Sequence, residues 1–278
     1  MDISFASWNV EAFGGGRRGM NETKAQVKQR TLRCVGRMAQ VDPDIFGIYE
    51  VVGKYVFDDF MKKMPNHVFF LTEDVGVQEV LVGVKRKFAA FITQRSGFKS
   101  KVRSLRPGAL TTIRVGNEYV NFLFLHLKSG PDPRSWGLRY DMIEHVNNLK
   151  KSLDKREGAG GRANFIALGD LNTMGFSLKR RGESLDGKAE IEIMEKQIKL
   201  RKLKRLKKDH ENAWWGGGRI GPSNLDHVLA AEHLDFVDQG GAEIRVLGWP
   251  DKNTKAQQRA WIDKFSDHGI LTGVLRIP

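Results

Sequence analysis

Residues 163–174 join a short apolar run to side chains that can do chemistry. Residues 165–168 have the length and composition of a strand buried on both faces. The run stops at Gly169. Asp170 and Asn172 follow two residues apart, so they point the same way if the backbone stays extended. An acid and an amide at the carboxyl end of a buried strand lie where open α/β sheets place their ligands. The same residue types also form Asx turns, and this stretch alone leaves both interpretations open.

Other strand-like runs along the chain end in polar residues of the same kinds. These ends are Asn9, Glu50, His126, Asp226, and the pair Asp267 and His268. Carboxylate and amide oxygens are hard ligands that suit Mg²⁺, which keeps several waters and shares its coordination sphere with phosphate. Two histidines provide acid–base chemistry near neutral pH, whereas no cysteine cluster or His-x-x-x-His spacing indicates a zinc site. Glu11 could extend the metal site or be an acid of a solvated loop.

Hydrophobic periodicity indicates the elements that must position these residues. We expect helices at residues 23–40, 56–63 and 134–153. Strands are expected at 3–10, 44–49, 67–72, 79–87, 89–94, 109–115, 119–125, 165–168 and 270–275, with a further run that starts at Ser223. Strands and helices alternate early and hairpins follow in the middle, so the sheets should be mixed. No internal repeat or linker divides the chain, which favours one domain.

The composition limits the class of protein. A chain of 278 residues can form one large domain, and its 40% hydrophobic content is ordinary for a soluble protein. No apolar run approaches the length that spans a membrane, and the first residues lack the pattern of a signal peptide. The single cysteine, Cys34, rules out an intramolecular disulfide. We therefore expect a cytoplasmic protein without a membrane partner or an obligate protein partner.

The positive charge is concentrated in two segments. The net charge is +13, and residues 85–106 contain eight cations and no acid. Residues 176–208 contain twelve cations against five acids, so the remainder of the chain is close to neutral. Solubility charge is usually mixed in sign, whereas concentrated cations on a neutral body indicate a polyanionic partner.

Six short motifs, taken in order, resemble those of the endonuclease/exonuclease/phosphatase superfamily, the fold of pancreatic-type deoxyribonucleases and apurinic endonucleases. The motifs are Ser7-Trp8-Asn9-Val10, Pro43-Asp44-Ile45 with Glu50, His126-Leu127-Lys128-Ser129, Gly169-Asp170-Leu171-Asn172, Leu225-Asp226-His227 and Ser266-Asp267-His268. The resemblance implies an α/β fold, a four-layer sandwich of two packed mixed sheets flanked by helices, with one site at their rim. It implies a single catalytic domain over residues 1–278, and it leaves residues 176–219 as an apparent basic insertion.

The resemblance also implies which residues bind metal and water. Glu50 would be the main Mg²⁺ ligand, helped by Asn9 and Asp267, and Mn²⁺ should substitute for Mg²⁺. Asp170 and Asn172 would hold or activate the attacking water and the phosphate.

Two histidines receive separate roles from the same resemblance. His268 would contact the scissile phosphate as a base or an electrophile, oriented by Asp226. His126 resembles the second histidine of the deoxyribonuclease branch, which assists the leaving oxygen. Its carboxylate partner in that branch lies at the start of an upstream strand, and Glu79 is the nearest match.

At two places the chain departs from the motifs that mark particular branches of the superfamily. Residues 223–226 lack the Trp-Cys-Asp-Arg pattern of inositol-phosphate phosphatases. Residues 126–129 stand where the apurinic endonucleases carry a tyrosine-centred motif. Both departures count against those branches.

Residues 199–208 include seven cations in ten positions, with a leucine at every third position from Leu200. On a helix these leucines drift off the apolar face that precedes them, so we expect an exposed arm. The arm should grip phosphates beside the active site, although a solvated helix without a role is the alternative. The expected substrate contacts are Lys202, Lys204, Arg205 and Lys208, together with Arg106 and Lys128.

The sequence thus favours a Mg²⁺-dependent phosphodiesterase that hydrolyses nucleic acid, in particular a DNA endonuclease with low sequence specificity. The alternative enzyme is a phosphatase or phosphodiesterase for a small or lipid-headgroup phosphate ester. A non-catalytic nucleic-acid-binding relative is a third hypothesis, and the complete polar set argues against it.

Overall fold

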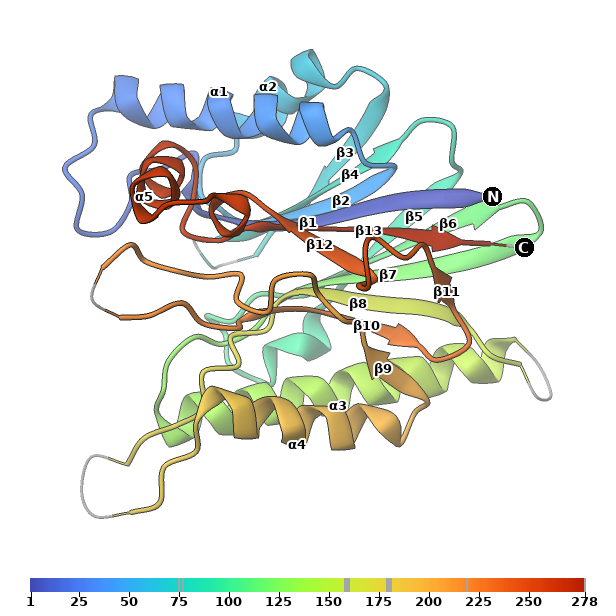
Figure 1. Cartoon of the computed structure of the whole chain (residues 1–278). Helices are drawn as coiled ribbons and strands as arrows, with labels where there is room; N and C mark the ends of the chain where they lie inside the picture. The colour runs from blue at the N-terminus through green and yellow to red at the C-terminus, as the bar shows by residue number, and fades with distance from the viewer. Residues whose placement is uncertain (75, 77, 158–160, 179–181, 219, 278) are drawn as a thin grey trace.

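Two β-sheets packed face to face form the centre of the chain, and helices cover both outer faces (Figure 1). The computed structural model describes residues 1–74, 76, 78–157, 161–178, 182–218 and 220–277. The layers run helix, sheet, sheet, helix, which confirms the predicted four-layer sandwich of two mixed sheets. No helix in the described ranges is long and apolar enough to cross a membrane.

The first sheet has seven strands within the described residues. Its order is β11 (Asp235–Phe236), β13 (Ile270–Arg276), β1 (Asp2–Phe13), β2 (Ile45–Val51), β4 (Glu79–Lys85) and β3 (His67–Leu71), and β12 (Ile244–Leu247) also pairs with β13. β1 and β2 are parallel, and Asn9 on β1 lies opposite Tyr49 on β2. Asn9 of β1 and Glu50 of β2 therefore come together at one rim of the sheet.

The second sheet has six strands in the same described part of the chain. Its order is β5 (Ala90–Arg95), β6 (Gly108–Val115), β7 (Glu118–His126), β8 (Asn164–Asp170), β10 (Asp226–Ala231) and β9 (Leu203–Arg205). β7 and β8 are parallel, with His126 opposite Asp170, and β10 is antiparallel to β8, with Asp226 also opposite Asp170. The pairing register alone thus gathers three of the predicted site residues.

Helices pack on the outer face of each sheet (Figure 1). α1 (Lys24–Val41), α2 (Val56–Lys63) and α5 (Lys255–Lys264) lie on the first sheet, and α3 (Pro133–Arg156) and α4 (Gly187–Lys199) lie on the second. The Thr23 side chain caps α1 through a capping box with Gln26. Cys34 on α1 is buried in the cluster that includes Trp8 and Phe46, so it is a core residue.

Every helix and strand expected from periodicity is present, with ends shifted by a few residues. The helices α4 and α5 and the short strands β9, β11 and β12 were not expected. α5 buries only Trp261 and Ile262, which is too few apolar positions for a clear helical pattern. Short edge strands are equally hard to recognise, because pairing with a neighbour stabilises them more than their own composition does.

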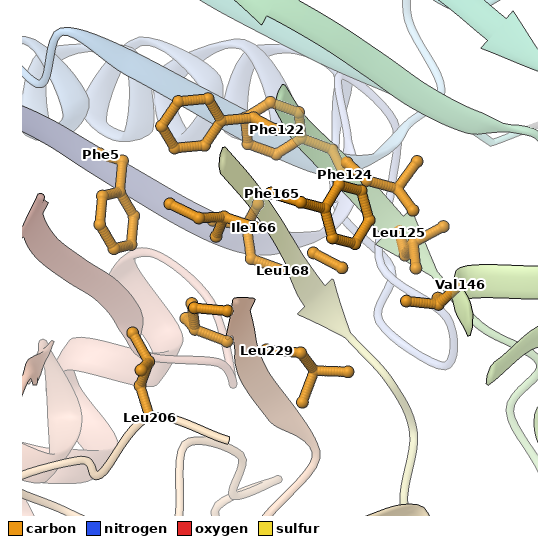
Figure 2. Close-up of a cluster of buried hydrophobic side chains, with 14 of the residues drawn as sticks. Phe5, Phe122, Phe124, Leu125, Val146, Phe165, Ile166, Leu168, Leu206 and Leu229 are labelled. Atoms are coloured by element: carbon orange, nitrogen blue, oxygen red, sulfur yellow. The ribbon is translucent and has the colours of Figure 1, made fainter. Parts of the chain in front are cut away.

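Aromatic side chains fill the space between the two sheets (Figure 2). Phe5 comes from the first sheet, and Phe122 and Phe124 come from the second. The rings of Phe5 and Phe122 lie 5.9 Å apart, within the range of favourable aromatic contact. Full burial of one such side chain stabilises the fold by about 1.5–3 kcal/mol. This core holds the two sheets together, and with them the rims at which the polar residues lie.

A polar clamp joins the sheets close to the rim. The Tyr49 hydroxyl donates to the Leu168 carbonyl at 2.9 Å and accepts from Ser7 Oγ at 3.2 Å, so it links β2 to β8. The next residue, Gly169, has φ +146°, and a Cβ there would overlap the Leu125 carbonyl oxygen. Only glycine fits that close approach of β8 to β7. Asp170 follows directly and is aimed into the rim by this geometry.

Arg139 of α3 connects the outer helices to the loops that leave the rim. The buried guanidinium bonds Glu190 of α4 through Nε at 2.7 Å and through Nη2 at 2.8 Å. It also donates to the carbonyls of Lys128 and Gly130 after β7, and to that of Gly175 after β8. Every donor group of this side chain is used, which is what a buried cation requires.

We predict that Arg139→Met lowers the free energy of unfolding by about 3–5 kcal/mol, because it leaves the Glu190 carboxylate buried without its partner. Urea unfolding followed by tryptophan fluorescence would measure the change. Arg276→Met is the matched control, because its ion pair with Asp235 is exposed and should contribute less than about 1 kcal/mol. Equal losses in the two variants would contradict this assignment.

Candidate active site

Asp170 is the centre of a buried polar network at the rim opposite the chain termini (left in Figure 1). Its Oδ2 accepts from Asn9 Nδ2 at 2.9 Å, and its Oδ1 accepts from the Asn172 backbone N–H at 3.0 Å. His126 Nε2 and His268 Nε2 lie 3.6 Å and 3.8 Å from Oδ2. Four residues from four of the six motifs therefore surround one carboxylate that is 2% exposed.

Glu50 extends this network across the first sheet. Its Oε1 accepts from Asn9 Nδ2 at 3.1 Å, and its Oε2 accepts from Gln78 Nε2 at 2.8 Å and from the Ala12 N–H at 3.1 Å. Glu50 has φ +60°, a conformation in which a non-glycine residue is strained. Strain of this kind persists where the surrounding structure holds a side chain for function. Arg106 in turn donates to Gln78 Oε1, so the Gln78 amide links the Arg106 guanidinium to the Glu50 carboxylate.

His268 is held by carboxylates. Its Nδ1 donates to Asp226 Oδ2 at 2.8 Å, and Asp267 Oδ1 lies 4.0 Å from its Nε2. Burial alone would lower the pKa of His268, but the carboxylates of Asp226, Asp267 and Asp170 outweigh burial and hold that pKa well above its usual value. Because Nδ1 is engaged by Asp226, the protonated ring presents Nε2–H toward Asp170.

His126 has the opposite electrostatic character. Burial, followed by the positive charges of Arg106 and His268, holds the pKa of His126 well below its usual value. Burial also raises the pKa of the Asp170 carboxyl to about 7, although the charge on His268 opposes this. The site therefore combines one cationic imidazole, one neutral imidazole and one acid whose pKa suits proton transfer near neutral pH.

The oxygen donors beside Asn9 fit a hard divalent cation. Asn9 Oδ1 is buried and has no hydrogen-bond partner, so it is free to ligate. Glu11, which the sequence left open, is half-buried, and burial and then the Asp267 carboxylate raise its pKa to about 7. Carboxylates crowded in this way repel one another until a cation lies between them. Even so, no group of three or more acids, histidines or cysteines in the described ranges is already gathered to hold a metal ion.

The predicted pairing of Glu79 with His126 is wrong. Glu79 accepts from Thr72 Oγ1 at 2.5 Å and from the Asp74 N–H at 3.1 Å, and it makes no contact with His126. Its neighbour Gln78 reaches the site instead. Consecutive residues at a strand end point to opposite sides, so a shift of one position exchanges the two side chains. The motif was located correctly, but no sequence signal identified the inward residue.

The predicted arm at 199–208 is not an exposed helix. α4 ends at Lys199, and β9 pairs with β10 while Leu203 and Leu206 enter the core. β9 is antiparallel to β10 and therefore runs toward the rim, and Arg205 lies opposite Leu229, three residues or about 10 Å along β10 from Asp226. The arm is therefore an edge strand of the second sheet and not a helix that projects beside the active site. Residues 179–181 and 219 of the apparent insertion at 176–219 lie outside the described part of the chain.

Three of the four cations predicted on this arm are engaged by the protein. Lys204 pairs with Glu243 at 2.9 Å and Arg205 with Glu195 at 2.6 Å, whereas Lys202 is exposed. Lys208 is buried and donates to Asn224 Oδ1 at 2.6 Å and to the Asp226 carbonyl at 2.8 Å. Burial lowers the pKa of this lysine to about 7. The prediction of Lys208 as a phosphate ligand is wrong, because its ammonium group supports the strand that carries Asp226.

The other two predicted cations lie at the rim. Arg106 is half-buried and contacts Gln78, as described above. Lys128 follows His126 by two residues, is half-buried and donates to the Ser129 carbonyl. Substrate contact by Arg106 and Lys128 stays a prediction.

A profile of the Endonuclease/Exonuclease/phosphatase family matches residues 6–268. The chain belongs to this family. Membership indicates a hydrolase of phosphodiesters or phosphate esters, in a family whose enzymes generally use divalent metals. No curated protein matches the chain in sequence.

Solved structures of the family share this fold. Truncated TDP2 from Caenorhabditis elegans aligns with a TM-score of 0.65 at 14% identity, over 99% of this chain and 98% of that one. D. rerio TDP2 complexed with a single-strand DNA product aligns with a TM-score of 0.63 at 14% identity, over 99% of both chains. The endonuclease/exonuclease/phosphatase from Bacteroides vulgatus gives 0.62 at 11% identity over 100% of both. At these identities the likeness shows the fold alone.

We predict that Asp226→Asn lowers the pKa of His268, because burial is then opposed by fewer negative charges. NMR titration of the imidazole resonances in the metal-free protein would measure the shift. Asp235→Asn removes an exposed acid at the opposite end of the sheet and is the matched control. An unchanged pKa of His268 in Asp226→Asn would contradict the electrostatic account.

Proposed function

We propose that this family member is a metal-dependent phosphodiesterase that hydrolyses nucleic acid, in particular a DNA endonuclease of low sequence specificity. The observation that carries the proposal is the placement of two histidines of opposite character beside buried Asp170. A phosphodiester needs an activated water, a charge that stabilises the phosphoryl oxygens and a donor near the leaving oxygen. The network offers one group for each task.

Asp170 is suited to take the proton of the attacking water as the new P–O bond forms. Its side chain is held by Asn9 and by the Asn172 N–H, so it does not have to be oriented during the reaction. His268 donates Nε2–H to a phosphoryl oxygen, and its charge is maintained by Asp226. His126, as a neutral imidazole, donates a hydrogen bond to the leaving oxygen when the old P–O bond breaks.

Glu50 and Asn9 would hold the divalent cation, with Glu11 and Asp267 close enough to contribute charge. A bound Mg²⁺ or Mn²⁺ would supply positive charge to the developing oxyanion. Hydrogen bonds from Gln78 and from the Ala12 N–H fix the Glu50 carboxylate before any cation arrives. Fixed outer contacts of this type normally tune metal affinity.

Nucleic acid is favoured as the substrate by charge. The chain carries a net charge of +13, and a basic connection leads to Arg106 at the rim. The related D. rerio TDP2 was crystallised with a single-strand DNA product, which supports the same substrate class. Binding of a small or lipid-headgroup phosphate ester would not need so much positive charge.

Incubation with plasmid, single-stranded DNA, RNA, a phosphoinositide and a chromogenic phosphomonoester, with and without EDTA, tests the proposal. Nicking of plasmid that EDTA abolishes and that Mg²⁺ or Mn²⁺ restores is the expected result. Hydrolysis of the phosphomonoester or the phosphoinositide alone would favour the alternative substrates. Full activity in excess chelator would contradict the metal assignment.

We predict that Asp170→Asn and His268→Ala each lower turnover by about 10²–10⁴-fold, the usual contribution of one acid–base group. Glu50→Gln should lower turnover by orders of magnitude through loss of the cation, and His126→Ala should do so through loss of leaving-group assistance. Glu79→Gln is the matched control and should keep near-normal turnover, since Glu79 bonds Thr72 and Asp74 rather than the site. Steady-state kinetics on a phosphodiester would measure each change. Normal turnover in His126→Ala would remove that residue from the mechanism.

A further inference from the structure

The connection between β5 and β6, residues 95–106, lies at the catalytic rim, and we call it the rim loop. Arg95 at the end of β5 is opposite Gly108, and Ala109 is opposite Phe124, two residues before His126. The connection therefore leaves and re-enters the sheet at the level of His126. Its last residue, Arg106, contacts Gln78, which in turn bonds Glu50.

The rim loop presents three exposed cations. Arg95, Lys101 and Arg103 are exposed, and the described part of the chain offers none of them an ion pair. Lys99 differs, because it pairs with Asp74 at 2.6 Å and anchors the loop. Exposed cations that have no ion pair within the protein are available to an external anion.

The rim loop also borders a hollow of about 680 Å³ against α3. Lys99, Lys101 and Arg103 line it together with Ser100, whose buried hydroxyl has no partner. The opposite wall is formed by Asp141 and His145 of α3, which pair with each other at 3.4 Å. Cations and a free hydroxyl on one wall suit the oxygens of a phosphate group.

Three of the four cations predicted as phosphate contacts in the basic segment at 199–208 are already engaged. Lys204 and Arg205 lie opposite β10 residues that are four and three positions from Asp226, and Lys204, Arg205 and Lys208 already have partners within the protein. The net charge of this segment thus overstates the number of its cations that are available to bind a ligand.

We propose that the rim loop binds the phosphates of a nucleic-acid strand next to the scissile bond and guides that strand into the site. The inference rests on the proposed function, since it assigns the substrate path of the same site. Arg103 and Arg106 are three positions apart, so their Cα atoms lie within about 11 Å. Because a strand carries a phosphate at every nucleotide, with an axial rise of about 3.4 Å in duplex DNA, this reach covers a few consecutive phosphates.

The test is DNA binding by the triple variant Arg95→Gln, Lys101→Gln, Arg103→Gln. Both it and its control are made in an Asp170→Asn background, so that binding is measured without cleavage. The control is Lys202→Gln, Lys204→Gln, Arg205→Gln, which removes the same charge from the other segment. Fluorescence anisotropy with a labelled single strand at several salt concentrations gives affinity and salt slope, and circular dichroism checks the fold.

We expect weaker binding by the rim-loop variant and a salt slope that falls by about 0.7 for each lost phosphate contact, or about 2 in all. The control should keep the affinity and slope of its parent. Unchanged binding by the rim-loop variant would overturn the inference, and so would equal losses in the two variants. Failure of the proposed function would appear separately, as wild-type protein that hydrolyses no phosphodiester while the binding difference remains.

Discussion

The structure depends on one buried carboxylate, that of Asp170. A carboxylate at 2% exposure is tolerated only if hydrogen bonds and opposite charge replace the lost water. Asn9 and the Asn172 N–H provide the hydrogen bonds, and protonated His268 provides the charge. These partners come from β1, from the turn after β8 and from the start of β13. The site therefore forms only when the two sheets are packed against each other in this arrangement.

Environment rather than residue type separates the roles of the two histidines. His126 and His268 are both buried within 4 Å of Asp170 Oδ2. Only His268 also faces Asp226, and only His126 faces the positive charge of Arg106. Two identical side chains thus differ in charge at the same pH, which lets one site supply both a cation and a neutral donor.

The positions of the motifs and most of the strands could be predicted because strand ends follow apolar runs. Asp170, Asp226 and His268 converge as the strand-end argument expects. The register of Glu79 could not be predicted, because a shift of one residue leaves the apolar pattern of β4 almost unchanged. The run at 199–208 was misjudged for another reason. Pairing with the edge of β10 and burial of Leu203 and Leu206 override a cationic pattern that suggests an exposed helix.

The central claim is that Asp226 and His268 act as one unit on the phosphate. A double-mutant cycle on phosphodiester hydrolysis, with Asp226→Asn, His268→Ala and the combined variant, tests it most directly. The account predicts that the combined variant loses little more activity than His268→Ala alone, because Asp226 acts only through that imidazole. Losses that multiply in the combined variant would contradict the account and give Asp226 an independent role.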